Sequence, residues 1–380
     1  MTTEKFQDVR MVLEDRVVTG TLSIEDDTIV AVDIVDDITD AALEGDYLLP
    51  GLVELHTDHL EGHYAPRPGV RWNAVASIQA HDAQVAGSGI TTVFDALRVG
   101  MDEDARITAT DMRVLADAIV EAREADRLRA DHFIHLRCEV SSEDVVNGFA
   151  LFRDEPLLRI ASLMDHTPGQ RQFVSLDKYK EYYQGKTGMS DAEFNTFVAH
   201  RTGLADKYSP QNRQKIAEEC RRKGVILASH DDATTDHVDE ALEHDVQIAE
   251  FPTTLEAARA SHDAGLKVLM GAPNLVRGGS HSGNVSAQAL AENGVLDVLS
   301  SDYIPFSLLH AAFLLTERVD TIRLPDAVNM VSKTPAEAAG LDDRGILEAG
   351  KRADFLQATY DPVSGVPVVR GVWREGRRVA

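Results

Sequence analysis

The sequence has few of the features that mark secreted, membrane-spanning or disulfide-rich proteins. Its 380 residues include only two cysteines, Cys138 and Cys220, which cannot build a disulfide framework. No run of about 18 apolar residues, the length that a membrane-spanning helix requires, is present. The N-terminal segment lacks the basic-then-apolar pattern of a signal peptide. We therefore expect a cytoplasmic protein with reduced thiols and no membrane partner.

Positive charge is also scarce. The chain has 38 Lys and Arg residues against 63 Asp and Glu residues, which gives a formal net charge of −25. Such a charge repels nucleic acids and anionic membrane surfaces, so neither is an expected partner. An anionic substrate would need a local cluster of Arg or Lys. The oligomeric state is left open, and a homo-oligomer is compatible with the sequence.

A repeated unit of one short apolar strand and one helical stretch fills the middle of the chain. The predicted strands are Val53–His56, Thr91–Asp95, Phe133–Glu139, Ile160–Met164, Val225–His230, Val246–Ala249, Lys267–Met270 and Val295–Ser301. Helical patterns separate them, as in Asn73–Ala86 and Ala233–Glu243. This alternation predicts an α/β fold, a (β/α)8 barrel, with an open doubly wound sheet as the rival.

The two ends of the chain share a sequence pattern that differs from that of the middle. Short alternating runs punctuated by Gly and Asp predict β-strands in residues 1–50 and again in residues 345–380. We expect these ends to build one β-subdomain around a barrel of residues 51–344. Residues 170–223 are too long for one crossover, so we expect a helical and loop insertion over the active-site face.

Metal-type ligands follow the predicted strands. His56 and Asp58 end the first strand and, two residues apart, project to the same side. A single His or Asp at the end of a strand usually only caps a loop. Here five predicted strands end in, or lead directly into, His, Asp or Glu, and the carboxyl ends of barrel strands meet at one face. The predicted metal ligands are His56, Asp58, Glu139, His166, His230 and Asp302.

These ligands divide into two predicted groups. His166 and His230 would hold one ion, while His56, Asp58 and Asp302 would hold the other. Glu139 would bridge the two ions through its two oxygens. Asp231 and Asp232 are expected to orient His230. The other histidines considered are expected to be structural: His81, His132, His135, His237, His244, His262 and His310.

Local cations and a glycine-rich loop supply candidate phosphate contacts. The loop after the first strand carries Arg67 and Arg71, and Arg171 follows His166. A further loop after the seventh strand offers backbone N–H groups that can cradle phosphate. Its predicted substrate-binding residues are Arg277, Gly278, Gly279 and Ser280, with His281 as a catalytic residue beside them.

At these residues the sequence resembles the amidohydrolase superfamily, and more closely its diphosphatase family of the carbon–phosphorus lyase pathway. The motifs that carry the resemblance are LLPGLVELHTDHLEGHYAPRPGVRW, HLRCE, MDHTPGQRQF, SHDD, FPTT, GAPNLVRGGSHSGN and DVLSSDY, from Leu48 to Tyr303. The tail motif GILEAGKRADF resembles the superfamily's return to the β-subdomain. The superfamily's usual first-strand pair is His-x-His, whereas this chain has His56-x-Asp58, as expected of this family.

The resemblance implies a metal-dependent barrel that hydrolyses α-D-ribose 1-methylphosphonate 5-triphosphate, or a related ribose 5-triphosphate, to the 5-phosphate and pyrophosphate in phosphonate catabolism. One or two divalent ions are expected. Zn²⁺ is favoured, and the harder oxygen ligand Asp58 keeps Mn²⁺ and Fe²⁺ as rivals. Asp302 is the expected general base. The alternatives are a cyclic-amide hydrolase or deaminase on the same scaffold, and a barrel without turnover that serves as an assembly partner.

Overall fold

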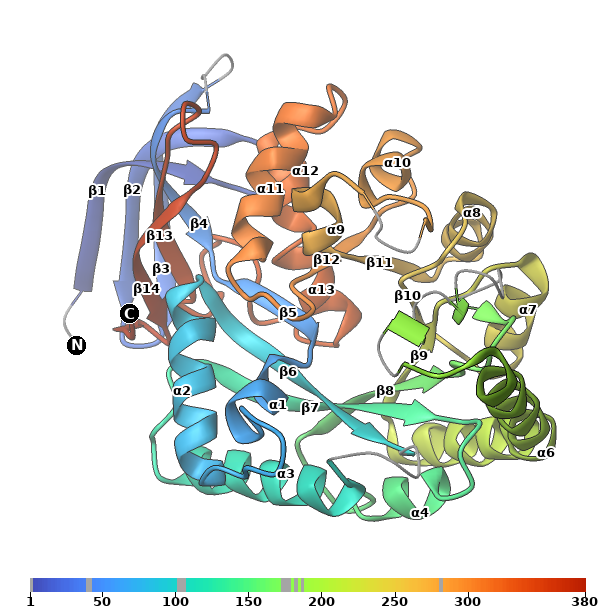
Figure 1. The fold of residues 1–380 in the computed structure, drawn as a ribbon. Helices are drawn as coiled ribbons and strands as arrows, with labels where there is room; N and C mark the ends of the chain where they lie inside the picture. Colours follow the sequence, from blue (N-terminus) through green and yellow to red (C-terminus); the bar gives the residue numbers. More distant parts are fainter. Residues whose placement is uncertain are drawn as a thin grey trace.

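The computed structural model describes residues 3–38, 43–100, 107–171, 179–180, 184–185, 188–279 and 283–380. Eight parallel strands form the centre of the molecule and follow one another in chain order (Figure 1). They are β5 (Leu52–Thr57), β6 (Ile90–Val99), β7 (Asp131–Glu139), β8 (Leu158–Met164), β9 (Ile226–His230), β10 (Ile248–Glu250), β11 (Lys267–Gly271) and β12 (Val298–Ser300).

The last strand returns to the first. Thr57 forms a parallel bridge with Asp302, and the Thr57 hydroxyl donates a hydrogen bond to the Asp302 carbonyl over 2.5 Å. The Ser300 hydroxyl donates to the carbonyl of His56 over 2.7 Å. These contacts bring the ends of the sheet together, so the predicted (β/α)8 barrel is confirmed and the open doubly wound sheet is not observed.

Helices surround the strands (Figure 1). They are α1 (His59–Tyr64), α2 (Ala74–Gly87), α3 (Ala109–Glu124), α4 (Val145–Ala150), α6 (Asp191–Lys223), α7 (Thr235–Glu243), α8 (Leu255–Asp263), α9 (Ala272–Arg277), α10 (Ala287–Glu292), α11 (Ser307–Arg318), α12 (Leu324–Asn329) and α13 (Lys333–Ala338). Asn, Ser or Thr side chains cap several of their N-termini, such as Asn73 on α2 and Thr234 on α7. Their apolar faces bury side chains such as Leu115 and Ile119 of α3 against the strands.

The longest described helix, α6, reaches the carboxyl end of β7. It begins with a capping box between Ser190 and Glu193 and ends at Gly224, whose φ of 69° suits glycine. The Asn212 amide donates to the carbonyls of Val140 and Ser142, which follow β7, over 3.0 and 2.8 Å. The insertion of residues 170–223 over the active-site face stays a prediction. Among the described helices, none has the length and apolarity needed to cross a membrane.

A second sheet joins the two ends of the chain. Its strand order is β15 (Arg377–Arg378), β14 (Val368–Arg374), β13 (Phe355–Tyr360), β4 (Gly45–Pro50), β1 (Thr3–Val12), β2 (Val17–Glu25) and β3 (Thr28–Ile38). Neighbours are antiparallel except β1 and β4, which pair in parallel at Met11 and Leu48. Separate sheets are therefore observed, while the domain boundaries at residues 50 and 345 remain predictions.

The chain passes from one sheet to the other at Gly51, between β4 and β5. The Gly51 N–H donates to the Asp354 carbonyl over 2.9 Å. A Cβ at this position would lie 2.3 Å from the Thr91 hydroxyl oxygen, so only glycine fits. The hydrogen bond to Asp354 therefore holds the start of the barrel directly against the C-terminal segment of the second sheet.

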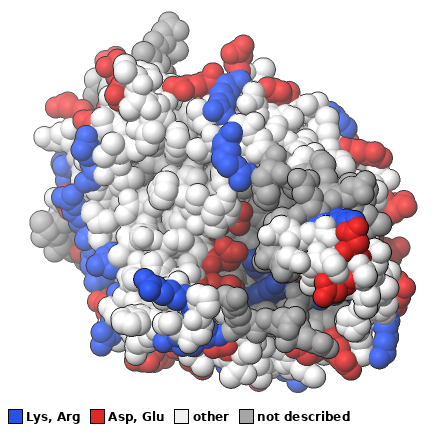
Figure 2. Space-filling view, in the orientation of Figure 1, with Lys and Arg blue, Asp and Glu red and all other residues white. Residues whose placement is uncertain are grey.

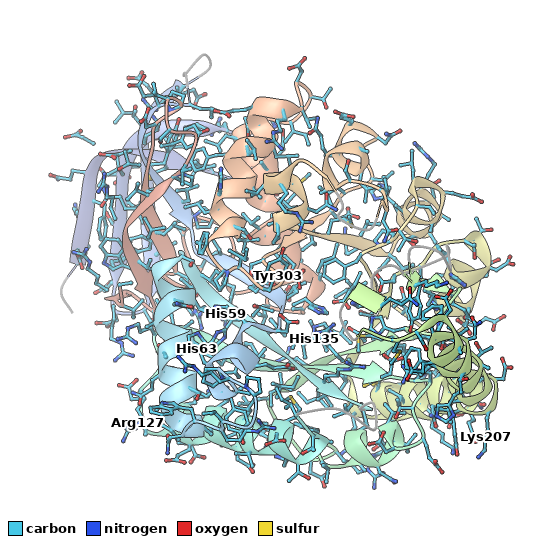
Figure 3. The ribbon with its side chains drawn as sticks, viewed as in Figure 1. His59, His63, Arg127, His135, Lys207 and Tyr303 are labelled. Atoms are coloured by element: carbon cyan, nitrogen blue, oxygen red, sulfur yellow. The ribbon has the colours of Figure 1, made fainter. Side chains whose placement is uncertain are left out.

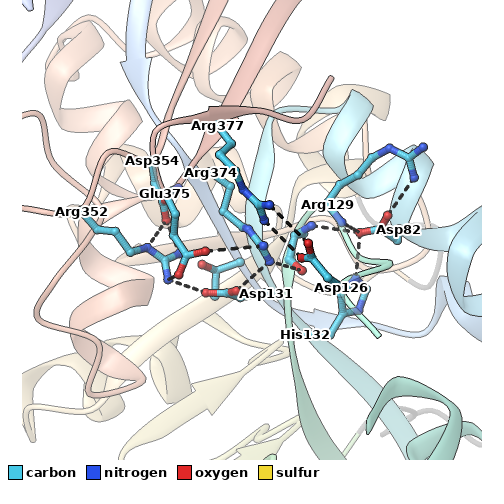
Figure 4. A network of polar contacts seen from close by, with 12 residues as sticks. Asp82, Asp126, Arg129, Asp131, His132, Arg352, Asp354, Arg374, Glu375 and Arg377 are labelled. Carbon is cyan, nitrogen blue, oxygen red and sulfur yellow. Dashed lines mark hydrogen bonds and ion pairs between the residues drawn. The ribbon is translucent and has the colours of Figure 1, made fainter. Parts of the chain in front are cut away.

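An ion-pair network fastens the second sheet to the barrel (Figure 4). Asp131 begins β7 at the amino end of the barrel. Its carboxylate accepts hydrogen bonds from Arg344, Arg352 and Arg374 at 2.8, 2.6 and 3.0 Å. Burial alone would raise the pKa of Asp131, but Arg352 and Arg344 lower it to about 2. The three arginines together neutralise the negative charge of this carboxylate at the junction between the two sheets.

Candidate active site

A pocket of about 200 Å³ opens at the carboxyl ends of the barrel strands. Residues at or near the carboxyl ends of β5, β7, β9, β10, β11 and β12 contribute to its wall. Its polar and ionisable lining includes His56, Arg137, His230, Asp231, Asn274, Arg277, Asn284, Asp302 and Tyr303. Acidic and basic side chains are visible near the centre of the face in Figure 2. This is the end at which barrel enzymes place their active sites.

Strand alternation directs the histidine of β5 into the barrel. Glu54 and His56 share a face, and both are almost fully buried. The Nδ1 atom of His56 lies 2.9 Å from the Glu250 carboxylate at the end of β10, which fixes the ring. Burial lowers the pKa of His56, and Arg137 and His230 lower it further. The imidazole is therefore neutral, which is the form that binds metals.

A second group of ligand atoms comes from the ends of β8 and β9. His166, His230 and Asp231 each offer one atom within 4.8 Å of the others. Asp231 Oδ2 lies 2.9 Å from Nδ1 of His230 and 3.7 Å from Nε2 of His166. Asp231 thus contacts His230 as expected, but it is also a candidate ligand. Asp232 contacts Arg171 instead of His230.

Glu139 lies beside His166. It accepts hydrogen bonds from the backbone N–H of His166 over 3.0 Å and from the Ser141 hydroxyl over 2.8 Å, and its Oε2 atom lies 2.5 Å from His166 Nδ1. Burial favours the protonated acid, but His166 and then Arg98 hold the pKa of Glu139 well below its usual range. Glu139 is therefore an anion, while its bridging role stays a prediction.

Several acidic groups meet around the guanidinium of Arg137. Arg137 donates to the Asp58 carboxylate over 3.0 Å. Burial and, after it, the nearby charge of Asp58 raise the pKa of Asp302 to about 7. Burial and Asp58 act in the same way on Glu61, whose pKa is also about 7. The negative charge is thus incompletely neutralised, and a bound cation would stabilise these carboxylates.

The backbone is strained at three strand ends of the pocket. Asp231, Phe251 and Asp302 have φ angles of 59°, 52° and 55°, although none is glycine. Such conformations are uncommon for L side chains and collect at functional sites. They turn the chain sharply after β9, β10 and β12. All three side chains consequently line the pocket.

One of the predicted phosphate-binding arginines lines the pocket. Arg277 ends α9, and its guanidinium donates to the Tyr303 hydroxyl over 3.3 Å and to the Gly279 carbonyl over 3.4 Å. Gly278 and Gly279 follow with positive φ angles of 84° and 150°. Ser280 and His281 lie outside the described residues, so the predicted roles of both stay predictions.

The other three predicted arginines are not among the pocket-lining residues. Arg67 is exposed. Arg71 pairs with Asp111 over 3.1 Å and lies over the Tyr64 ring. Arg171 is buried, and its two terminal nitrogens contact the carboxylates of Asp232 and Glu240. Its charge is already neutralised, which argues against direct phosphate contact in this conformation.

Sequence reasoning did not assign a role to Arg137 or Glu250. A signal for Arg137 was available, because His135, Arg137 and Glu139 alternate with Ile134, Leu136 and Cys138 along β7 (Figure 3 labels His135). Such alternation places three polar side chains on the inner face of the barrel. Glu250 ends β10 directly after the apolar residues Ile248 and Ala249, so it carried the same signal as the other polar strand ends, but its partner His56 is 194 residues away.

Comparison with known proteins places the chain among characterised enzymes by similarity. The model of the amidohydrolase family matches residues 163–380. The chain is 45% identical over 374 residues to the α-D-ribose 1-methylphosphonate 5-triphosphate diphosphatase of Escherichia coli (strain K12), covering 98% of each chain. It is 24% identical over 388 residues to a 5-methylthioadenosine/S-adenosylhomocysteine deaminase of Bacillus cytotoxicus, covering 90% of this chain and 81% of that one.

Solved structures with the same fold cover nearly the whole chain. The N-acetyl-D-glucosamine-6-phosphate deacetylase of Mycobacterium smegmatis superposes with a TM-score of 0.65 at 18% identity and covers 100% of both chains. The dihydropyrimidinase of Brevibacillus agri gives a TM-score of 0.60 at 14% identity, with 99% of this chain and 95% of that chain covered. At these identities the likeness concerns the fold alone.

Proposed function

This chain is a hydrolase that belongs to the amidohydrolase family, and from that premise we propose that it cleaves α-D-ribose 1-methylphosphonate 5-triphosphate, or a related ribose 5-triphosphate, to the 5-phosphate and pyrophosphate. The observation that carries the proposal is that one pocket is lined both by histidines and aspartates and by Arg277. The histidines and aspartates are His56, His230, Asp231 and Asp302. An acidic group suits divalent cations, and an arginine suits phosphate oxygens. The full-length relative supports the same chemistry.

The residues present fit divalent metal ions. Neutral imidazole at His56, the group of His166, His230 and Asp231, and the incompletely neutralised Asp302 together form a mixed nitrogen and oxygen donor set. We propose that these residues, with Asp58 and Glu139, hold one or two ions. Zn²⁺ is favoured by the histidines, while the carboxylates keep Mn²⁺ and Fe²⁺ as alternatives. Bound ions would acidify water and polarise phosphoryl oxygens.

The chain's own residues account for proton transfer and charge neutralisation. Asp302, at the end of β12, takes the proton from the attacking water. The water oxygen bonds to the phosphorus nearest the sugar, and the bond from that phosphorus to the pyrophosphate oxygen breaks. Arg277 stabilises the negative charge on the departing phosphates, and its planar fork can contact two oxygens at once. His281 is proposed to assist there.

Phosphorus NMR of the purified, metal-loaded enzyme with a ribose 5-triphosphate tests this assignment. We expect pyrophosphate and the sugar 5-phosphate to appear together as the first products. Stepwise release of orthophosphate would contradict attack at the phosphorus nearest the sugar. Turnover of cyclic amides or aminated purines without phosphate cleavage would favour the alternative, to which the 24% identical deaminase points.

We also propose a cytoplasmic location. Both cysteines are buried and unpaired, and burial raises the pKa of each thiol. The substrate is a small phosphorylated sugar, and the large negative charge argues against nucleic acid as a partner.

A further inference from the structure

Three histidines meet outside the pocket, where α1 crosses α2. His59 and His63 are four residues apart on α1, so both side chains lie on one face of that helix. His81 comes from α2 and is fully buried. Figure 3 labels His59 and His63 close together beside α2. None of the three lines the pocket.

The three rings are close enough to share one ion. Nδ1 of His59 lies 3.1 Å from Nδ1 of His81. One nitrogen from each of the three residues lies within 4.8 Å of the others. Three Zn–N bonds of about 2.0–2.1 Å in tetrahedral geometry separate their nitrogens by roughly 3.3 Å. His59 and His81 already match this separation, and a small movement of His63 completes it.

A carboxylate behind His81 prepares that ring to bind a metal. Nε2 of His81 lies 2.7 Å from one oxygen of the buried Asp95, and Nδ1 of His132 lies 2.7 Å from the other. When the Nε2–H of His81 donates to Asp95, its Nδ1 lone pair is directed toward His59. A carboxylate that accepts from the far nitrogen of a ligating histidine is the usual support of such ligands.

We propose that His59, His63 and His81 form a transition-metal site separate from the pocket. Three imidazole nitrogens with no carboxylate in direct contact with the ion favour Zn²⁺ over Mg²⁺ or Ca²⁺, which prefer oxygen ligands. The ion would hold α1, a helix of six residues, against α2. The segment after α1 carries Arg67 and Arg71, so the ion would also fix the start of that segment.

Metal counting on the full chain tests the site. The protein is stripped with a chelator, loaded with Zn²⁺ alone, desalted and analysed for zinc. We expect wild type to hold one more equivalent than His63→Ala or His59→Asn. His310→Ala, on α11, is the matched control because His310 is also partly buried, and it should hold as much zinc as wild type.

A rescue variant separates ligand loss from misfolding. His63→Cys supplies another zinc ligand, so it should restore the equivalent that His63→Ala loses. Zinc should also raise the melting temperature of wild type and His63→Cys by more than that of His63→Ala. Equal zinc content in wild type and His63→Ala would overturn the proposal, as would a His63→Cys variant with the same deficit as His63→Ala.

Discussion

The two ends of the barrel surround their buried carboxylates differently. At the amino end, Asp131 receives hydrogen bonds from Arg344, Arg352 and Arg374, and its pKa falls to about 2. At the carboxyl end, Asp302 lies near Asp58 and the guanidinium of Arg137, and its pKa rises to about 7. Both carboxylates are largely removed from water, so the difference comes from the surrounding charges.

This difference separates a structural site from a chemical one. A carboxylate saturated with arginines has no remaining capacity for a metal ion or a proton, and it fastens one sheet to the other. A carboxylate with too few cations can take up a proton or bind a metal ion, which are the properties that hydrolysis requires. Burial alone would not have distinguished these two aspartates.

The largest expected effect is on the stability of the junction. Asp131→Asn leaves three arginines without their shared anion, so we expect the free energy of unfolding to fall by roughly 3 kcal/mol or more, as for other broken buried ion pairs. Denaturant unfolding monitored by circular dichroism measures this. Asp126→Asn, which breaks the exposed pair with Arg377 in Figure 4, is the control and should leave the midpoint close to wild type. If Asp131→Asn were as stable as Asp126→Asn, the structural role assigned to Asp131 would be contradicted.

The next effect is on catalysis. Asp302→Asn removes the proposed general base, so we expect kcat to fall at least about 100-fold, with KM much less affected. The stability of the metal-free protein should not decrease, because the substitution removes a carboxylate that Asp58 repels. Pyrophosphate release and denaturant unfolding of the same preparation measure both. Near-native turnover would leave Asp302 as a ligand or a structural group only.

The two aspartates should also differ in their pH dependence when metal is absent. The folded-state pKa of Asp302 is raised from 3.8 to about 7, so its contribution to stability is lost as pH rises through that interval. The folded-state pKa of Asp131 is lowered to about 2, so its contribution is present above 3.8 and is lost as pH falls toward 2.

Denaturant unfolding of metal-free wild type and Asp302→Asn from pH 5 to 7.5 measures this dependence. Relative to wild type, Asp302→Asn should become more stable with rising pH, by at most about 1.4 kcal/mol per pH unit. An unchanged difference between the two proteins across this range would show that Asp302 has the same pKa in the folded and unfolded states.

The smallest effect concerns substrate affinity. Arg277→Ala should raise KM for a ribose 5-triphosphate about tenfold, which corresponds to about 1.4 kcal/mol. The loss should be smaller for a diphosphate analogue, which has less charge to anchor. The sequence also predicts Arg67 as a phosphate contact, but exposed Arg67 does not line the pocket, so Arg67→Ala is the matched comparator with the smaller expected change in KM. An unchanged KM for Arg277→Ala would remove this arginine from the site.

The sequence by itself determined the order of strands and helices and the positions of most polar strand ends. Observed and predicted strands overlap throughout, and the largest differences lie at the ends, as in β6, which runs to Val99 instead of Asp95. His56, His230 and Asp302 could be predicted because the carboxyl ends of parallel barrel strands face the same side. Apolar runs ending in His or Asp were sufficient to find them.

Only the tertiary structure decided which charges are neutralised. Asp131 begins an apolar strand and Asp302 follows one, but their neighbours in sequence do not show how many cations surround each carboxylate. The arginines that neutralise Asp131 lie 213, 221 and 243 residues further along the chain. Arg171 was an equally reasonable candidate for phosphate until folding placed it between Asp232 and Glu240. Electrostatic interactions depend on distance in space, and local sequence patterns do not contain that distance.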